Sequence, residues 1–253
     1  MAHLATATDF FGHVRRVRDG DFRVDAGANS FATSGDPPAE ATLPQGSGFL
    51  YKPDPLSLFV DPCENVTIYV ATVYVSASNG SDTSCTGAVA APFATIRFAL
   101  RRVPANGVVV VLPGRYDEGQ TTIGKAGVTV RGVNATSRPT IRSSPLRGGD
   151  VFSVAAERVT LEDLEVVGGY TFTVSLKGRM ATIRNCLLHG GGTAVVGILR
   201  SAALATVEGC VIRNSGQRIP RQGDGVFVQG ASWVRIANNT LTNIRSTAVH
   251  VRE

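Results

Sequence analysis

The sequence predicts an all-β solenoid: a parallel β-helix with three strands in each coil of about 22 residues. Three observations predict it: an internal repeat, alternation of apolar and polar residues within each repeat, and a turn residue at one fixed place in every copy. The aligned copies start at Val159, Ala181, Ala205 and Val234, so the steps between them are 22, 24 and 29 residues. The composition agrees, because 28 glycines and one tryptophan among 253 residues suit turn-rich β structure.

Each copy begins with two short strands that meet at a sharp bend. Period-two alternation predicts the strands, and a residue that tolerates tight turns marks the bend: Asp163, Asn185, Gly209 and Asn238. A glycine-rich or polar loop and a third strand follow in each copy, and these third strands are expected at 172–176, 194–199, 226–229 and 248–251. The repeat therefore predicts three strands per coil.

Stacking of the coils at about 4.8 Å places equivalent residues in columns along the axis. Two inward columns are expected to form the core, one of Leu161, Ile183, Val207 and Ile236, the other of Val166, Leu188, Ile212 and Leu241. An outward column holds Glu162, Arg184 and Glu208, whose signs alternate. We interpret these charges as structural, because exposed ion pairs need no other role.

The segment upstream of the repeats is expected to begin the solenoid. Phe93, Ile96, Leu100 and Val103 share one face of a predicted short helix, which would cap the apolar end of the core. Less regular coils are expected between residues 108 and 155.

The repeats and the cap resemble the right-handed parallel β-helix, or pectin-lyase-like, superfamily over residues 73–253. The cap pattern also resembles that of β-helix repeat proteins without an identifiable active-site signature. The resemblance implies a polysaccharide partner, no cofactor and an extracellular or surface location, although no secretory signal is visible. It also implies that chemistry lies on the outward face of the strand that opens each coil, which is the third strand of the repeats aligned above.

The domain organisation is expected to be simple. Residues 1–60 are predicted to form a poorly structured arm and linker, and residues 61–253 the β-helix domain. The basic run at 13–18 is interpreted as a solvated face, so no nucleic-acid partner is expected, and no segment is long enough to span a membrane. The chain stops inside a coil, which favours a fragment of a longer protein over a complete chain.

The candidate site surrounds the long entry loop at 215–224. If Val226 and Val228 point inward, and likewise Val249 and Val251, their neighbours point outward and form a patch with the loop cations. The predicted glycan-binding residues are Lys177, Arg218, Arg221, Asp224, Phe227, Gln229, His250 and Arg252. No catalytic residue is assigned. Cations, one carboxylate and an aromatic ring would suit an acidic polysaccharide.

Three functions stay open at this point. The first is a non-catalytic module that binds acidic glycans, the second a lyase or epimerase of polyuronates, and the third a structural or adhesive β-helix without a ligand. A Ca²⁺-dependent lyase is disfavoured because Asp224 stands alone as an oxygen ligand. Hydrolysis is disfavoured: Gly223-Asp224-Gly225 resembles the first part of the polygalacturonase pattern, but Ser246-Thr247-Ala248 stands where that pattern has Asp-Asp on the following coil.

The four cysteines divide into two pairs. Cys63 and Cys85 flank the first predicted strand, and a disulfide between them would staple the cap of an exported protein. Cys186 and Cys210 occupy one column, and parallel stacking aims both side chains the same way, so we predict two free, buried thiols. No metal site is predicted, because no second ligand is suitably spaced.

Overall fold

The computed structural model describes residues 4–8, 14–18, 71–83, 86–143, 149–216 and 222–253, and the chain divides into two compact units, Met1–Val66 and Thr67–Glu253. In the first unit, β1 (Leu4–Thr8) pairs antiparallel with β2 (Val14–Arg18). The sequence predicts no strand in this part of the chain. The boundary near residue 60 between the arm and the β-helix domain stays a prediction. The described residues hold no helix with the length and apolarity that a membrane span needs.

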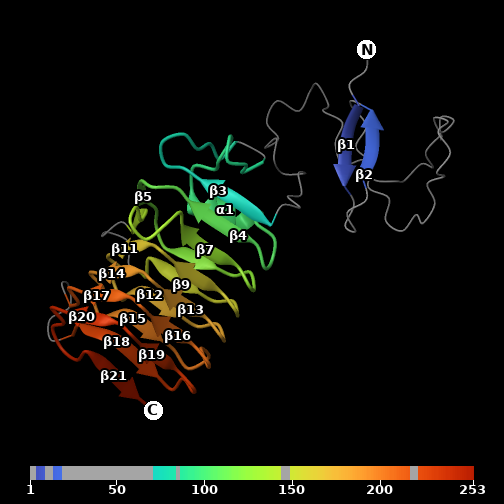
Figure 1. Ribbon diagram of the computed structural model, residues 1–253. Coiled ribbons are helices and arrows are strands. Elements are labelled where there is room, and N and C mark those ends of the chain that lie inside the picture. Colours follow the sequence, from blue (N-terminus) through green and yellow to red (C-terminus); the bar gives the residue numbers. More distant parts are fainter. Residues whose placement is uncertain (1–3, 9–13, 19–70, 84–85, 144–148, 217–221) are drawn as a thin grey trace. The chain divides into compact units, whose positions relative to one another are not determined.

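The second unit is a parallel β-helix, as predicted, in which three sheets run along one axis (Figure 1). The first sheet contains β3 (Thr72–Val75), β4 (Val108–Val111), β7 (Thr129–Gly132), β10 (Thr160–Glu162), β13 (Thr182–Arg184), β16 (Thr206–Glu208) and β19 (Arg235–Ala237). The second contains β5 (Arg115–Asp117), β8 (Thr140–Arg142), β11 (Glu165–Val167), β14 (Leu187–His189), β17 (Val211–Arg213) and β20 (Thr240–Thr242). The third contains β6 (Thr121–Ile123), β9 (Phe152–Val154), β12 (Phe172–Leu176), β15 (Ala194–Ile198), β18 (Asp224–Gln229) and β21 (Val249–Arg252).

The predicted register is confirmed. Leu161 pairs with Ile183, and the same column continues through Val207 to Ile236. The second inward column pairs its four predicted residues in the same way. These side chains are almost fully buried except on the last coil, so each coil is stabilised by the apolar area that it shares with its two neighbours.

The bend between the first and second strands requires left-handed backbone. Asp163, Asn185, Gly209 and Asn238 all have φ between 54° and 61°. Glycine, asparagine and aspartate accept this region most readily, which explains the repeated residue types. The predicted position of the bend is therefore confirmed in all four copies.

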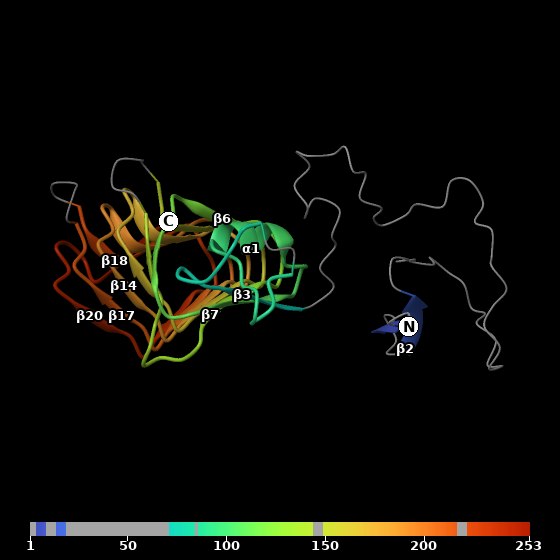
Figure 2. The same ribbon diagram turned by 90° about the horizontal axis from the view of Figure 1, so that it is seen from above.

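The capping helix is α1 (Ile96–Arg102), which packs against β3, β4 and β6 at the N-terminal end of the coils (Figure 2). Thr95 is its N-cap, and the Thr95 side chain accepts a hydrogen bond from the backbone N–H of Phe98. The carboxylate of Glu118 accepts the N–H groups of Ile96 and Arg97, and burial raises the pKa of this carboxyl above its ordinary value. At the other end, Lys125 Nζ donates to two carbonyl oxygens of the last turn.

Candidate functional site on the third sheet

The predicted site lies on the outward face of the third sheet, where one position of each strand forms a column. Pairing in register places Ser153, Ser175, Gly197, Phe227 and His250 in this column. Its chemistry therefore changes along the axis, from hydroxyls through a gap at glycine to an aromatic ring and an imidazole.

Two aromatic rings form a platform in the middle of this face. Phe172 and Phe227 stack nearly parallel, with ring centroids 6.4 Å apart and planes 14° apart. The space above Gly197 holds the ring of Phe172, because a Cβ at Gly197 would lie 2.7 Å from it. The edge of His250 meets Phe227 at a centroid distance of 5.2 Å. Glycine at 197 is thus what allows the two phenylalanines, two coils apart, to approach each other.

Beside the platform, a carboxylate holds an imidazole. Asp224 is 7% exposed; its Oδ1 accepts the backbone N–H of Thr247 at 3.1 Å, and its Oδ2 lies 2.9 Å from Nδ1 of His250. An ionised carboxylate can only accept, so Nδ1 donates in this pair and Nε2 remains available to accept a proton or a hydrogen bond. The imidazole side chain is 45% exposed. The arrangement presents an oriented imidazole to solvent.

An aspartate makes the same pair of hydrogen bonds three coils earlier, where both partners are buried. Asp150 Oδ1 accepts the backbone N–H of Phe172 at 3.1 Å, and its Oδ2 accepts the hydroxyl of Ser175 at 2.6 Å. In both copies the aspartate opens a coil and ties it to the next coil through one backbone and one side-chain bond. The hydrogen bonds from the aspartate to the next coil are therefore structural in both places. The two places differ in the side chain that is bound, and His250, bound by Asp224, is the residue that can have a functional role.

Lys177 is directed toward earlier coils. Its Nζ donates to Ser153 Oγ at 2.9 Å, and Ser153 Oγ lies 3.4 Å from the hydroxyl of Ser175. Two serines thus connect the ammonium of Lys177 to Asp150. Lys177 contributes positive charge to the third sheet but does not join the Asp224–His250 pair.

The structure brings three of the predicted residues into contact, namely Asp224, Phe227 and His250. Gln229 and Arg252 pair in register at the next outward position and are exposed. Arg218 and Arg221 lie outside the described residues. Sequence reasoning missed Phe172 and Asp150. Within residues 67–253 the dipeptide Gly-Asp occurs only at 149–150 and 223–224, and this repetition was the signal that could have revealed the second aspartate.

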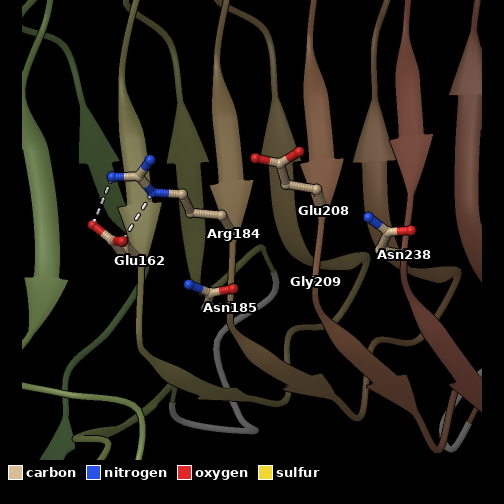
Figure 3. A pocket seen from close by; sticks show the side chains of 6 residues that line it. All are labelled: Glu162, Arg184, Asn185, Glu208, Gly209 and Asn238. Atoms are coloured by element: carbon tan, nitrogen blue, oxygen red, sulfur yellow. Dashed lines mark hydrogen bonds and ion pairs between the residues drawn. The ribbon is translucent and has the colours of Figure 1, made fainter.

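A polar hollow of about 350 Å³ lies elsewhere, on the outward side of the first sheet (Figure 3). It is lined by Glu162, Arg184, Asn185, Glu208, Gly209 and Asn238. The register of the predicted charge column is confirmed, but ion pairing is not continuous. Arg184 binds Glu162 through two bonds, Nε to Oε1 at 2.9 Å and Nη2 to Oε2 at 3.0 Å, and Arg235 pairs with Glu208. The bonds from Glu162 raise the pKa of Arg184 above its ordinary value.

The remaining polar residues give no metal site in the described part of the chain, where no group of three or more His, Cys, Asp or Glu side chains could hold an ion. Cys186 and Cys210 are free and buried, as predicted, and burial raises the pKa of the Cys186 thiol well above its ordinary value. Asn239, next in their column, accepts the N–H of Cys210 and donates to the carbonyl of Val207. The predicted disulfide partners, Cys63 and Cys85, lie outside the described residues.

The fold is the right-handed parallel β-helix of the pectin-lyase-like type, and solved structures share it. A pectate lyase matches with a TM-score of 0.58 and 18% identity over 68% of this chain and 48% of its own. An alginate lyase from a Paenibacillus species matches with a TM-score of 0.51 and 14% identity over 65% of this chain and 57% of its own. The chain thus spans about half the length of these two lyases. No protein-family model and no curated protein sequence matches the chain.

Proposed function

We propose that this protein is an extracellular or cell-surface module that binds acidic polysaccharides along the outward face of the third sheet. The observation that carries the proposal is the half-buried ring of Phe227, which stacks on the buried ring of Phe172, with Arg252 exposed on the same face. Aromatic rings provide rigid apolar surface against which the C–H groups of a sugar ring can pack. Arg252, exposed next to Gln229, supplies a guanidinium suited to a uronate carboxylate.

The structural comparisons support the class of ligand. Pectate and alginate are both polyuronates, and the lyases named for them have the same fold as this chain. Because the identities are below 20%, the choice of ligand has to be argued from the residues of this chain. The exposed guanidinium of Arg252, on the same face as Phe227, favours an anionic glycan over a neutral one.

Replacing Phe227 by alanine tests this proposal. We expect polygalacturonate to retard wild-type protein in native gels at low salt, and the variant to bind on the order of tenfold more weakly, because buried aromatic anchors commonly contribute more than 1 kcal/mol. Val133→Ala, at an exposed position outside the strands, is the matched control. Equal retardation of both variants, or none of wild type with either polygalacturonate or alginate, would contradict the proposal.

A second candidate function, a polyuronate lyase or epimerase, is favoured by the Asp224–His250 pair. Nε2 of His250 would take the proton on the carbon next to the uronate carboxylate, and Asp224 would hold the ring in the required tautomer. In elimination the released electron pair forms a C=C bond as the glycosidic oxygen leaves and is protonated; in epimerisation the carbon is reprotonated from its other face. A nearby cation would stabilise the enolate charge in both reactions.

The two activities and simple binding give different signals. Elimination raises the absorbance of the unsaturated uronate, and epimerisation in D₂O places deuterium on the attacked carbon. If either occurs, His250→Ala should slow it by about 10²–10⁴-fold. Wild type that binds polyuronate but gives neither signal would exclude this second function and leave the binding module.

A further inference from the structure

The hollow on the first sheet arises from two omissions at the same coil. The ion pairs Glu162–Arg184 and Glu208–Arg235 each join neighbouring coils, whereas no ion pair between Arg184 and Glu208 is present among the described residues. At the same place, glycine replaces the side chain that the bend carries in the neighbouring coils. The strands β13 and β16 pair without interruption beneath, so the gap is one of side chains and not of backbone.

Two exposed carboxamides border the gap. Asn185 and Asn238 lie on either side of Gly209 (Figure 3), and neither side chain makes a hydrogen bond to the described parts of the protein. A continuous ladder of asparagines would let each carboxamide bond the next, but the gap at Gly209 prevents this. Each carboxamide therefore presents both donor and acceptor groups toward the hollow.

We propose that this hollow is a second binding site, separate from the face of the third sheet, for the hydroxyl groups of a neutral sugar. Its lining offers guanidinium and amide donors with carboxylate and amide acceptors. The charges balance, because each lining carboxylate has a guanidinium partner: Glu162 with Arg184, and Glu208 with Arg235. A hydroxyl both donates and accepts, so vicinal hydroxyls match this set, whereas a carboxylate ligand would meet Glu208 unfavourably.

The size of the hollow limits the ligand. The hollow has a volume of about 350 Å³ and is open to solvent, so it would contact only one side of a small ligand. A short neutral oligosaccharide, or the end of a branch on an acidic polymer, fits this limit. The first and third sheets would then bind different parts of a mixed glycan.

Filling the hollow tests the proposal. In Gly209→Asn the new side chain continues the ladder, because φ at Gly209 is 61° and asparagine already adopts 54° and 55° at positions 185 and 238. Its Cβ would lie 2.8 Å from Oδ1 of Asn185, which is the flexible end of a side chain and can move. Asn185→Gly is the complementary variant, because it removes one carboxamide without blocking the space.

The probes are cellobiose, xylobiose, mannobiose and galactobiose, with binding followed by saturation-transfer NMR. We expect wild type to bind at least one of them, both variants to bind it on the order of tenfold more weakly, and Phe227→Ala to bind it normally. Polygalacturonate binding should show the reverse pattern, so the two sites can fail independently. No binding of any probe by wild type, or unchanged binding by Gly209→Asn, would overturn the proposal. It would also be overturned if Gly209→Asn lost polygalacturonate binding instead.

Discussion

Replacing Leu161 by alanine is expected to lower the free energy of unfolding by about 2–5 kcal/mol. Leu161 is 1% exposed and lies in the inward column between Val130 and Ile183, one on the preceding coil and one on the following coil. The loss combines the transfer of the removed methyl groups with the cavity that the paired backbones cannot close. Urea denaturation followed by circular dichroism measures it.

The control for this substitution is Val133→Ala. Val133 is 45% exposed and lies outside the strands, so the change should stay within about 0.5 kcal/mol. Because each coil contacts only its neighbours, hydrogen exchange in Leu161→Ala should rise most in β7, β10 and β13. Similar midpoints for Leu161→Ala and Val133→Ala would show that the column is not the core.

The coil and its register could be predicted because one physical cause repeats. Alternating apolar residues must face the same interior on every turn, so a shift of one residue at Ile183 would expose a whole strand. The position of the bend could be predicted equally well, because asparagine, aspartate and glycine all tolerate left-handed backbone. The helix was found from its apolar face, although of the four predicted residues Phe93 lies before α1 and Val103 is its C-cap.

Departures from simple alternation could not be predicted. Phe172 lies two residues before the inward-facing Val174, so period two predicts that it points inward, but its ring lies over Gly197 on the outward face. Val249 and Val251 do continue inward columns, as their pairing with Val226 and Val228 shows. They are nevertheless 39% and 69% exposed, because no later described strand pairs with β21.

Part of the candidate site could be predicted from the sequence for the same reason. Outward positions of β18 and β21 follow from the register, which is how Phe227 and His250 were found. The 2.9 Å contact between Asp224 and His250 depends on how the chain turns before β18, and no periodicity encodes that turn. The hollow was hidden because it results from an absence: a glycine in a column whose other members carry polar side chains.

The loop that positions Phe172 is expected to be the most sensitive part of the site to a small change. Gly169→Ala should destabilise the protein by about 2 kcal/mol or more and weaken polygalacturonate binding as well. At Gly169 φ is 94°, which L side chains rarely adopt, and a Cβ would lie 1.9 Å from the carbonyl oxygen of Phe172. That atom belongs to the backbone, so relief requires moving the residue that carries the aromatic platform.

Two further glycines separate the causes. Gly191, one coil later, has no unusual φ, but a Cβ there would lie 2.0 Å from the carbonyl oxygen of Ala194, so Gly191→Ala tests the steric effect without the dihedral strain. Gly124→Ala is the neutral control, because nothing lies within 4 Å of its Cβ. Denaturation midpoints should fall for Gly169→Ala and Gly191→Ala and stay unchanged for Gly124→Ala. If Gly169→Ala kept both its midpoint and its glycan affinity, the described path of the backbone into β12 would be wrong, and with it the position of Phe172 over Gly197.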